Sequence, residues 1–314
     1  MKFSFSNWMG MARGANLPTI WTNVIAAWAI NAGAGPSLRW MPDWTDMTFF
    51  NLSTLAWLVL GASLIYAGGC FLNDACDHAF DRKYRSERPI PSGTISLTQA
   101  WVVGILQLLV GGYTMVAGAG CSWEWTLALL LCILAYDWVH KKTVWGILFM
   151  GGCRTLLWIT AGTAASGMSP APLLYVWAVA VGTYVVGISW YARTESNRQK
   201  EEVTDRLIDR MPILFLFGVP MLALAYLVLW NNLDPIRVFL VNSVGLLAGG
   251  VAFFAILKMR QPTEGSVGIG VSRLLAGICA VDATLLSFHA PLLVGPCVLL
   301  GAIAFILQKK FAAT

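Results

Sequence analysis

Charged residues are scarce in this sequence. Lys, Arg, Asp and Glu make up 12% of its 314 residues, whereas a soluble domain of this size carries about a quarter. Hydrophobic residues make up 57%, which excludes an ordinary soluble enzyme and predicts a polytopic membrane protein. The net charge of +5 comes from basic residues in short stretches between apolar runs, a pattern that orients membrane helices. It is not a concentrated basic patch, so no nucleic-acid partner is expected.

Paired cysteine motifs are also missing. The seven cysteines are scattered, mostly inside apolar segments, and none forms a C-x-x-C pair. This spacing excludes a disulfide framework and the usual zinc sites. The sequence therefore predicts reduced cysteines that fill space between helices.

Apolar runs long enough to cross a bilayer, about 20 residues each, account for most of the chain. Only residues 289–291 separate the last two, so nine and ten crossings both fit, and ten keeps Lys309 and Lys310 on the side of the N-terminus. The predicted fold is an all-α polytopic membrane helical bundle, with nine to ten transmembrane helices around a central cavity, as a single domain over residues 1–314. The runs lie near 17–34, 50–72, 97–119, 123–139, 144–166, 171–190, 211–230, 236–257, 268–288 and 290–308.

The two longest loops on the basic side carry most of the ionisable groups. If the runs alternate across the membrane, Arg39 and Arg237 are the only basic loop residues on the side opposite the N-terminus. Residues 73–96 and 191–210 are therefore expected in the cytoplasm. Both loops follow an even-numbered run and carry an acidic residue near its end, Asp77 in one and Glu195 in the other. This arrangement indicates a duplicated four-helix unit with both loops over one cavity.

An acidic motif follows the second run directly. If the helix continues, Asn73, Asp77 and Asp81 lie on one face at intervals of four residues, with Asp74 on its flank. Stacked carboxylates repel each other unless a cation neutralises them, and an oxygen-only ligand set suits Mg²⁺ with a phosphate-bearing substrate. The alternative is a solvated acidic helix end. Carboxylates near bilayer depth are costly, which favours a functional site.

Several basic residues lie where they could bind a diphosphate. Arg82 is adjacent to Asp81, and Lys141 follows the fourth run closely, although both also fit the simple excess of positive charge on the cytoplasmic side. In the second loop, Glu195 is a candidate metal ligand, with Arg193 as its partner or as a diphosphate clamp, or the two form a purely structural pair.

Two charged residues lie within the predicted membrane spans. Arg154 is about ten residues into the fifth run, and a guanidinium at that depth must face a cavity or a partner. Asp282 lies deep in the ninth run. We expect it to pair with Arg273 or to cap another polar contact, and no chemical role is assigned to it.

These motifs resemble the UbiA superfamily of intramembrane prenyltransferases. The resemblance rests on N-D-x-x-D-x-x-x-D at residues 73–81, R-P-x-P-S-G at 88–93, and Y-x-x-x-x-K from Tyr136 to Lys141. It implies that Asn73, Asp74, Asp77 and Asp81 hold Mg²⁺ against an isoprenyl diphosphate. The second aspartate motif of the family, D-x-x-x-D after the sixth span, is reduced here to Y-A-R-T-E at residues 191–195. Members typically have nine spans.

The resemblance implies a Mg²⁺-dependent transferase that moves an isoprenyl group from a polyprenyl diphosphate to an aromatic or alcohol acceptor. Asp77, Asp81 and Lys141 are the expected catalytic residues, and Arg82, Tyr136, Arg154 and Arg193 are expected to contact substrate. Because the second motif is incomplete, a non-catalytic lipid or small-molecule carrier on the same scaffold stays open. A CDP-alcohol phosphatidyltransferase is disfavoured, since the first loop lacks the Asp-Gly and Ala-Arg of that motif.

Overall fold

The fold is built from helices. The computed structural model describes residues 5–34, 50–140, 143, 145–164, 170–198, 211–218, 221, 225, 235–261, 263 and 265–310, and these contain helices and turns but no strand. The predicted all-α fold is thus confirmed. The helices are α1 (Phe5–Met11), α2 (Leu17–Ala34), α3 (Leu52–Cys76), α4 (His78–Tyr84), α5 (Leu97–Tyr113), α6 (Trp123–Val139), α7 (Gly146–Gly162), α8 (Pro172–Arg198), α9 (Met211–Ile213), α11 (Pro235–Met259), α12 (Ser266–His289) and α13 (Val294–Lys310), with the short segments η1 (Gly14–Asn16), η2 (Thr114–Gly118), η3 (Leu214–Gly218) and η4 (Pro291–Leu293).

Six of the described helices are long and apolar enough to cross a membrane: α3, α5 continued through η2, α8, α11, α12, and η4 continued through α13. The predicted number of nine or ten crossings is therefore not confirmed. Helices α6 and α7 have 17 residues each, at the lower limit of the range of about 17–25 residues that a span needs. The last two apolar runs form two separate helices, and most of the predicted run 211–230 lies outside the described residues.

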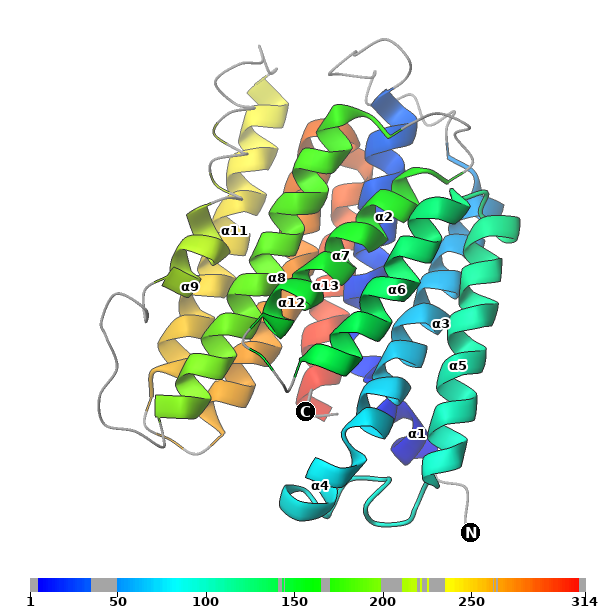
Figure 1. The fold of residues 1–314 in the computed structure, drawn as a ribbon. Coiled ribbons are helices and arrows are strands. Elements are labelled where there is room, and N and C mark those ends of the chain that lie inside the picture. The colour runs from blue at the N-terminus through cyan, green and yellow to red at the C-terminus, as the bar shows by residue number, and fades with distance from the viewer. Residues whose placement is uncertain are drawn as a thin grey trace.

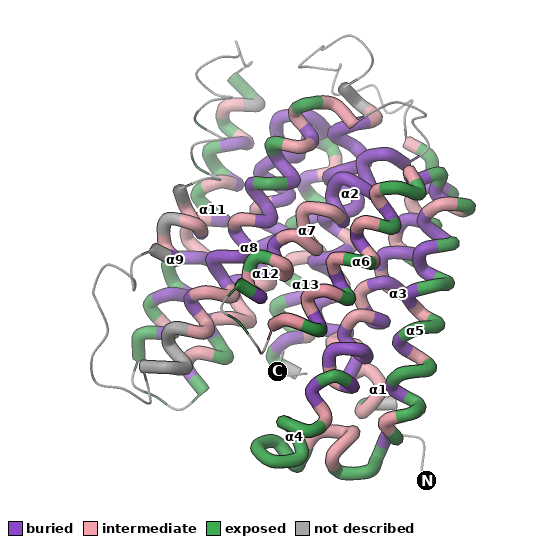
Figure 2. The backbone as a smooth tube through the Cα atoms, in the orientation of Figure 1, coloured by how far each residue is buried: buried purple, intermediate pink, exposed green. Residues whose placement is uncertain are grey.

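Helix α2 lies at the centre of the bundle, packed against α3, α7, α12 and α13 (Figure 1). Around it, α3 pairs with α5, α7 with α6 and α8, and α12 with α11 and α13. Figure 2 shows the contrast between the buried centre and the exposed outer side of α5. On the outer faces, Leu109 is 62% exposed and Leu246 is 77% exposed. Lipid chains are as apolar as these side chains and can cover them.

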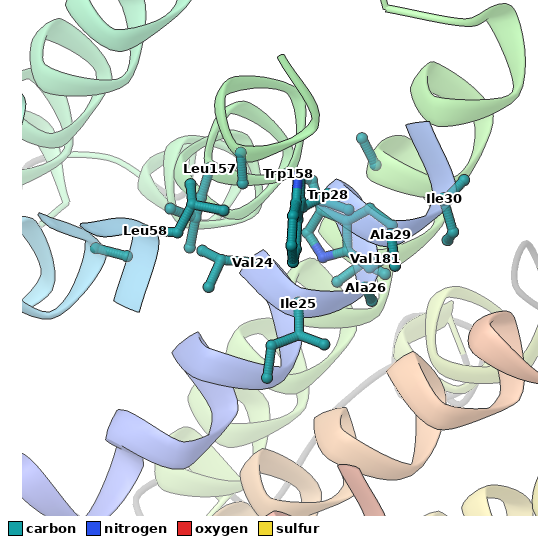
Figure 3. Packing of buried hydrophobic residues seen from close by; sticks show 14 of the residues in the cluster. Val24, Ile25, Ala26, Trp28, Ala29, Ile30, Leu58, Leu157, Trp158 and Val181 are labelled. Atoms are coloured by element: carbon teal, nitrogen blue, oxygen red, sulfur yellow. The ribbon is translucent and has the colours of Figure 1, made fainter. Parts of the chain in front are cut away.

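The core is centred on the last turns of α2. Val24, Ala26 and Ala27 are fully buried, and Trp28 of α2 and Trp158 of α7 are among the largest fully buried side chains. Figure 3 shows these two indoles close together, with Leu58 of α3, Leu157 of α7 and Val181 of α8 around the same part of α2. The small side chains let the neighbouring backbones approach, and the tryptophans fill the remaining space.

Helices α3 and α5 approach closely through glycines. A Cβ on Gly111 would lie 2.9 Å from the carbonyl oxygen of Gly61, and one on Gly68 would lie 2.9 Å from the carbonyl oxygen of Gly104. In each helix the two glycines are seven residues apart, so they share one face. This contact fixes the position of α3 along the axis of α5, and therefore also the position of the acidic motif at the end of α3.

We expect Gly111→Ala to lower the unfolding temperature of the detergent-solubilised protein, because the added methyl group collides with backbone that cannot move aside. Overpacking of this kind costs about 1–3 kcal/mol. Gly249→Ala in α11 is the matched control, since a Cβ there meets nothing within 4 Å and alanine favours the helix. Equal unfolding temperatures for the two variants would contradict the role given to this contact.

Candidate functional site

The acidic motif forms one buried face across a break between two helices. Helix α3 ends at Cys76 and α4 begins at His78, but the amide of Asp77 donates to the carbonyl oxygen of Asn73 (3.0 Å), and the amide of Asp81 donates to that of Asp77 (2.9 Å). The helical register therefore continues through the break. Asn73, Asp77 and Asp81 are 5%, 7% and 1% exposed. The face predicted from their spacing is confirmed, and it does not point to solvent.

The turn after α4 brings Arg88 back to this face. Gly93 adopts a left-handed conformation (φ 76°), which favours glycine, and the Ile95 amide closes the turn on the Pro89 carbonyl oxygen at 3.1 Å. Arg88 Nη1 lies 2.9 Å from Asp81 Oδ2 and 3.3 Å from Asp74 Oδ1. One guanidinium thus joins two carboxylates of the motif, a contact that sequence spacing does not reveal.

A second arginine reaches the motif from the N-terminal segment. Arg13, which precedes η1 in a left-handed backbone conformation (φ 46°), donates from Nη2 to Asn73 Oδ1 at 3.3 Å and lies 3.7 Å from Asp74 Oδ1. The side-chain amide of Asn73 donates in turn to Asp137 Oδ1 of α6 at 3.1 Å. Sequence reasoning missed Arg13 and Asp137 as members of the site. An acidic residue near the end of an otherwise apolar helix is the sequence feature that could have identified Asp137 as a site residue.

The end of α6 supplies an imidazole and an aromatic ring. His140 Nε2 lies 3.3 Å from Asp77 Oδ2, and the ring of Tyr136 stacks on that of His140 with centroids 4.9 Å apart. Tyr136 is in the last turn of α6, and His140 directly follows the helix one turn later, so both lie on the same side, toward the end of α3. Tyr136 was predicted as a substrate contact, and this packing brings it beside Asp77.

The donor set fits Mg²⁺ by its chemistry, although the ligands are not gathered around a single point. Among the described residues, no three His, Cys, Asp or Glu side chains are placed together as metal ligands. Four carboxylates stand against two guanidiniums and one imidazole, so the cluster is acidic. Asp137 Oδ2 is buried and no described residue donates a hydrogen bond to it. An oxygen in that state is stabilised by a cation.

A cavity extends from this polar cluster into the bundle. Its empty volume is about 940 Å³, which includes the part open to the outside. Arg13, Asn73 and Asp137 line the polar end, whereas most of the wall is apolar. The apolar lining comes from α2, α3, α6, α7, α8 and α12 and includes Ile20, Ala62, Ile65, Leu129, Ile133, Met150, Leu157, Val185 and Leu275. The predicted central cavity is therefore present, and it has a charged mouth and an apolar interior.

The other predicted site residues lie in different places. Arg82 is exposed on α4, and the arginine that contacts the carboxylates is Arg88. Arg193 donates from Nη1 to the carbonyl oxygen of Thr143 at 3.2 Å. This contact joins the C-terminal part of α8 to the backbone that follows α6, because Thr143 is three residues after His140. Lys141 lies outside the described residues, and so does the side chain of Glu195.

The two intramembrane charges meet through a third residue. Arg154 lines the cavity and donates from Nη1 to Asn23 Oδ1 at 2.6 Å. Asp282 Oδ2 accepts from Asn23 Nδ2 at 2.6 Å and from Thr22 Oγ1 at 2.5 Å. The partners of Asp282 are thus on α2. Of the two expectations for Asp282, the structure shows the polar contact and not the pairing with Arg273.

Comparison with known proteins gives a consistent result. A 4-hydroxybenzoate octaprenyltransferase of Polaromonas sp. is 30% identical over 141 residues, 42% of this chain and 44% of the relative. The mitochondrial 4-hydroxybenzoate polyprenyltransferase of Mus musculus is 29% identical over 205 residues, 60% of this chain and 47% of the relative. The chain spans about half the length of the curated relatives it matches.

A solved structure of a UbiA homologue from Archaeoglobus fulgidus bound to GPP and Mg²⁺ is 14% identical, covers 98% of this chain and 100% of that chain, and has a TM-score of 0.45. A TM-score and an identity this low do not add support to the family assignment. The model of the UbiA prenyltransferase family matches residues 24–268, well over half of the chain. The matched stretch contains the acidic motif, the turn at 88–93 and Tyr136. The resemblance seen in the sequence is confirmed, and this chain is an integral membrane protein that belongs to the UbiA prenyltransferase family.

Proposed function

We propose that this protein is a Mg²⁺-dependent prenyltransferase that moves an isoprenyl group from a polyprenyl diphosphate to an aromatic or alcohol acceptor. The observation that carries the proposal is the cavity, in which a polar end lined by Arg13, Asn73 and Asp137 opens into an apolar interior, with a total volume of about 940 Å³ that includes the part open to the outside. A polyprenyl diphosphate has the same two-part character, with a charged head and a long apolar tail. Such a match of polar and apolar surface is what a buried lipid site requires.

The head of the donor belongs at the mouth. Asn73, Asp74, Asp77 and Asp81 would hold Mg²⁺, and Asp137 extends this set. When bound, Mg²⁺ supplies positive charge that neutralises the diphosphate as it departs. Arg13 and Arg88 already lie among the carboxylates. Their guanidiniums are placed to donate hydrogen bonds to diphosphate oxygens, which a planar fork of donors recognises well.

The tail belongs in the apolar interior, where its burial excludes water from the reacting carbon. Breaking the carbon–oxygen bond leaves an allylic cation, which water would consume. Tyr66 and Tyr136 both line the cavity, and a ring face attracts a cation by about 0.5–2 kcal/mol. These residues would therefore stabilise the cation until the acceptor attacks it.

The experiment that tests this function uses the full chain in lipid nanodiscs. We expect pyrophosphate release and a prenylated product when geranylgeranyl or farnesyl diphosphate is supplied with 4-hydroxybenzoate, the acceptor in the names of the curated relatives. Chelation by EDTA should stop both, and Mg²⁺ should restore them. Donor binding without release of pyrophosphate, across aromatic and alcohol acceptors, would overturn the enzyme and favour the carrier.

A further inference from the structure

The wall of the cavity carries a buried ionic network that the diphosphate site does not use. Arg154 of α7, Asn23 of α2 and Asp282 of α12 are joined in series by the two 2.6 Å hydrogen bonds of Asn23. Asn23 and Asp282 are fully buried. Arg154 is the member of the series that lines the cavity.

The amide of Asn23 can take only one orientation in this network. An arginine has only donors and a carboxylate has only acceptors, so the Asn23 oxygen faces Arg154 and its nitrogen faces Asp282, as observed. The charges at the two ends balance within an apolar region. An unbalanced charge there would be costly, which ties the position of the guanidinium to a carboxylate on a different helix.

Arg154 lies deeper in the bundle than the acidic mouth. The Sγ of Cys153 is 3.6 Å from that of Cys132, so this part of α7 is level with Cys132 of α6. Asp137 at the mouth lies five residues further along α6. With a rise of 1.5 Å per residue, the separation along the helix is about 7.5 Å. The space between the mouth and Arg154 therefore suits a small acceptor beneath the diphosphate.

Part of the guanidinium remains available to a ligand. Among the described residues, both hydrogen bonds of Arg154, to Asn23 Oδ1 and to the Thr19 carbonyl oxygen at 3.4 Å, use Nη1. Arginine has five N–H donors, so Nη2 and Nε can still form the forked pair of hydrogen bonds that carboxylates accept.

We propose that Arg154 is the residue that selects the acceptor, by binding its carboxylate, and that Asn23 and Asp282 are positioning residues for it. This inference rests on the proposed function. A carboxylate fits better than a phosphate, because it brings one negative charge, which the unused Nη2 and Nε donors of Arg154 can stabilise through a forked pair of hydrogen bonds. A phosphate with nearly two negative charges would need more positive charge than this wall provides.

Binding measured without the donor separates this inference from the prenyl transfer. We expect 4-hydroxybenzoate to bind the full chain in nanodiscs, measured by calorimetry, and Arg154→Gln to weaken it about 10- to 100-fold. The neutral analogue 4-hydroxybenzamide should bind both proteins about equally. Arg273→Gln removes an arginine of α12 outside the cavity lining. It is the matched control and should leave the binding affinities for both ligands unchanged.

Several outcomes would overturn the inference. One is an equal loss of binding affinity for the benzoate and the benzamide in Arg154→Gln. Another is that the natural protein binds phenyl phosphate more tightly than it binds the benzoate. No binding of the benzoate to the natural protein also rejects it. If the benzoate binds as expected but no pyrophosphate is released, the proposed function fails while the assignment of Arg154 stands.

The positioning role has a readout of its own. Asp282→Asn should reduce the preference for benzoate over benzamide several-fold, because the guanidinium loses the charge that orients it, and should also lower the unfolding temperature. The double variant Arg154→Gln, Asp282→Asn removes both charges and should recover much of that temperature without recovering the preference. Unchanged preference in a folded Asp282→Asn protein would reject the role of Asp282.

Discussion

Replacing Asp77 by alanine is expected to abolish Mg²⁺-dependent release of pyrophosphate. Asp77 is the middle residue of the buried face, is 7% exposed, and has its Oδ2 3.3 Å from His140 Nε2. Losing it removes one proposed metal ligand and leaves the departing diphosphate without part of its charge neutralisation. A loss of several kcal/mol of transition-state stabilisation corresponds to a rate lower by about a thousandfold or more.

The measurement is the initial rate of pyrophosphate release in nanodiscs with saturating donor and acceptor, over a range of Mg²⁺ concentrations. Glu87→Ala is the matched control, because Glu87 is an exposed carboxylate in the loop after α4 and should leave the rate unchanged. Asp77→Glu keeps the charge but shifts the oxygens, so a small residual rate is expected from it. Full activity in Asp77→Ala would reject the acidic motif as the metal site.

Replacing Arg88 by alanine is expected to lower kcat/KM for the polyprenyl diphosphate by about a hundredfold, as loss of charge-assisted hydrogen bonds to the diphosphate predicts. In the structure this guanidinium joins Asp74 and Asp81 at 3.3 Å and 2.9 Å. Because it occupies the carboxylates that Mg²⁺ would take, Arg88 competes with the ion before the donor binds. The same variant should therefore need less Mg²⁺ for half-maximal rate.

The two effects of Arg88→Ala have opposite signs, which makes the prediction specific. Arg88→Lys should recover only part of kcat/KM, since an ammonium cannot replace the fork of a guanidinium. Arg85→Ala, an exposed arginine of the same loop, controls for loss of positive charge near the mouth. A higher Mg²⁺ requirement in Arg88→Ala would contradict the competition and would assign Arg88 to the metal-bound state instead.

The positions of most helices and one face of the site follow from local patterns. An apolar run marks a helix because its length and composition suit a bilayer, and the run that the sequence predicts at 123–139 has the bounds of α6. The spacing of Asn73, Asp77 and Asp81 predicts a shared face because a helix repeats every 3.6 residues. Length alone does not separate a span from a shorter buried helix, which is why the number of crossings was not confirmed.

The partners within the site could not be read in the same way. Arg88 returns to Asp74 and Asp81 only because a turn with a left-handed Gly93 reverses the chain. Arg13 and Asp137 meet at Asn73 from segments far from it in sequence. For Asp282, the arginine on its own helix was the natural candidate, yet its partners are Thr22 and Asn23.

The sequence by itself determined that this is a helical membrane protein with an acidic face at the end of α3, because composition and helical periodicity act over a few turns of one segment. Only the tertiary structure decided which charges meet at the mouth and that Arg154 stands in the cavity wall tied to Asp282. Those contacts depend on how helices distant in the chain pack around α2, and side-chain spacing along one helix carries no information about that packing.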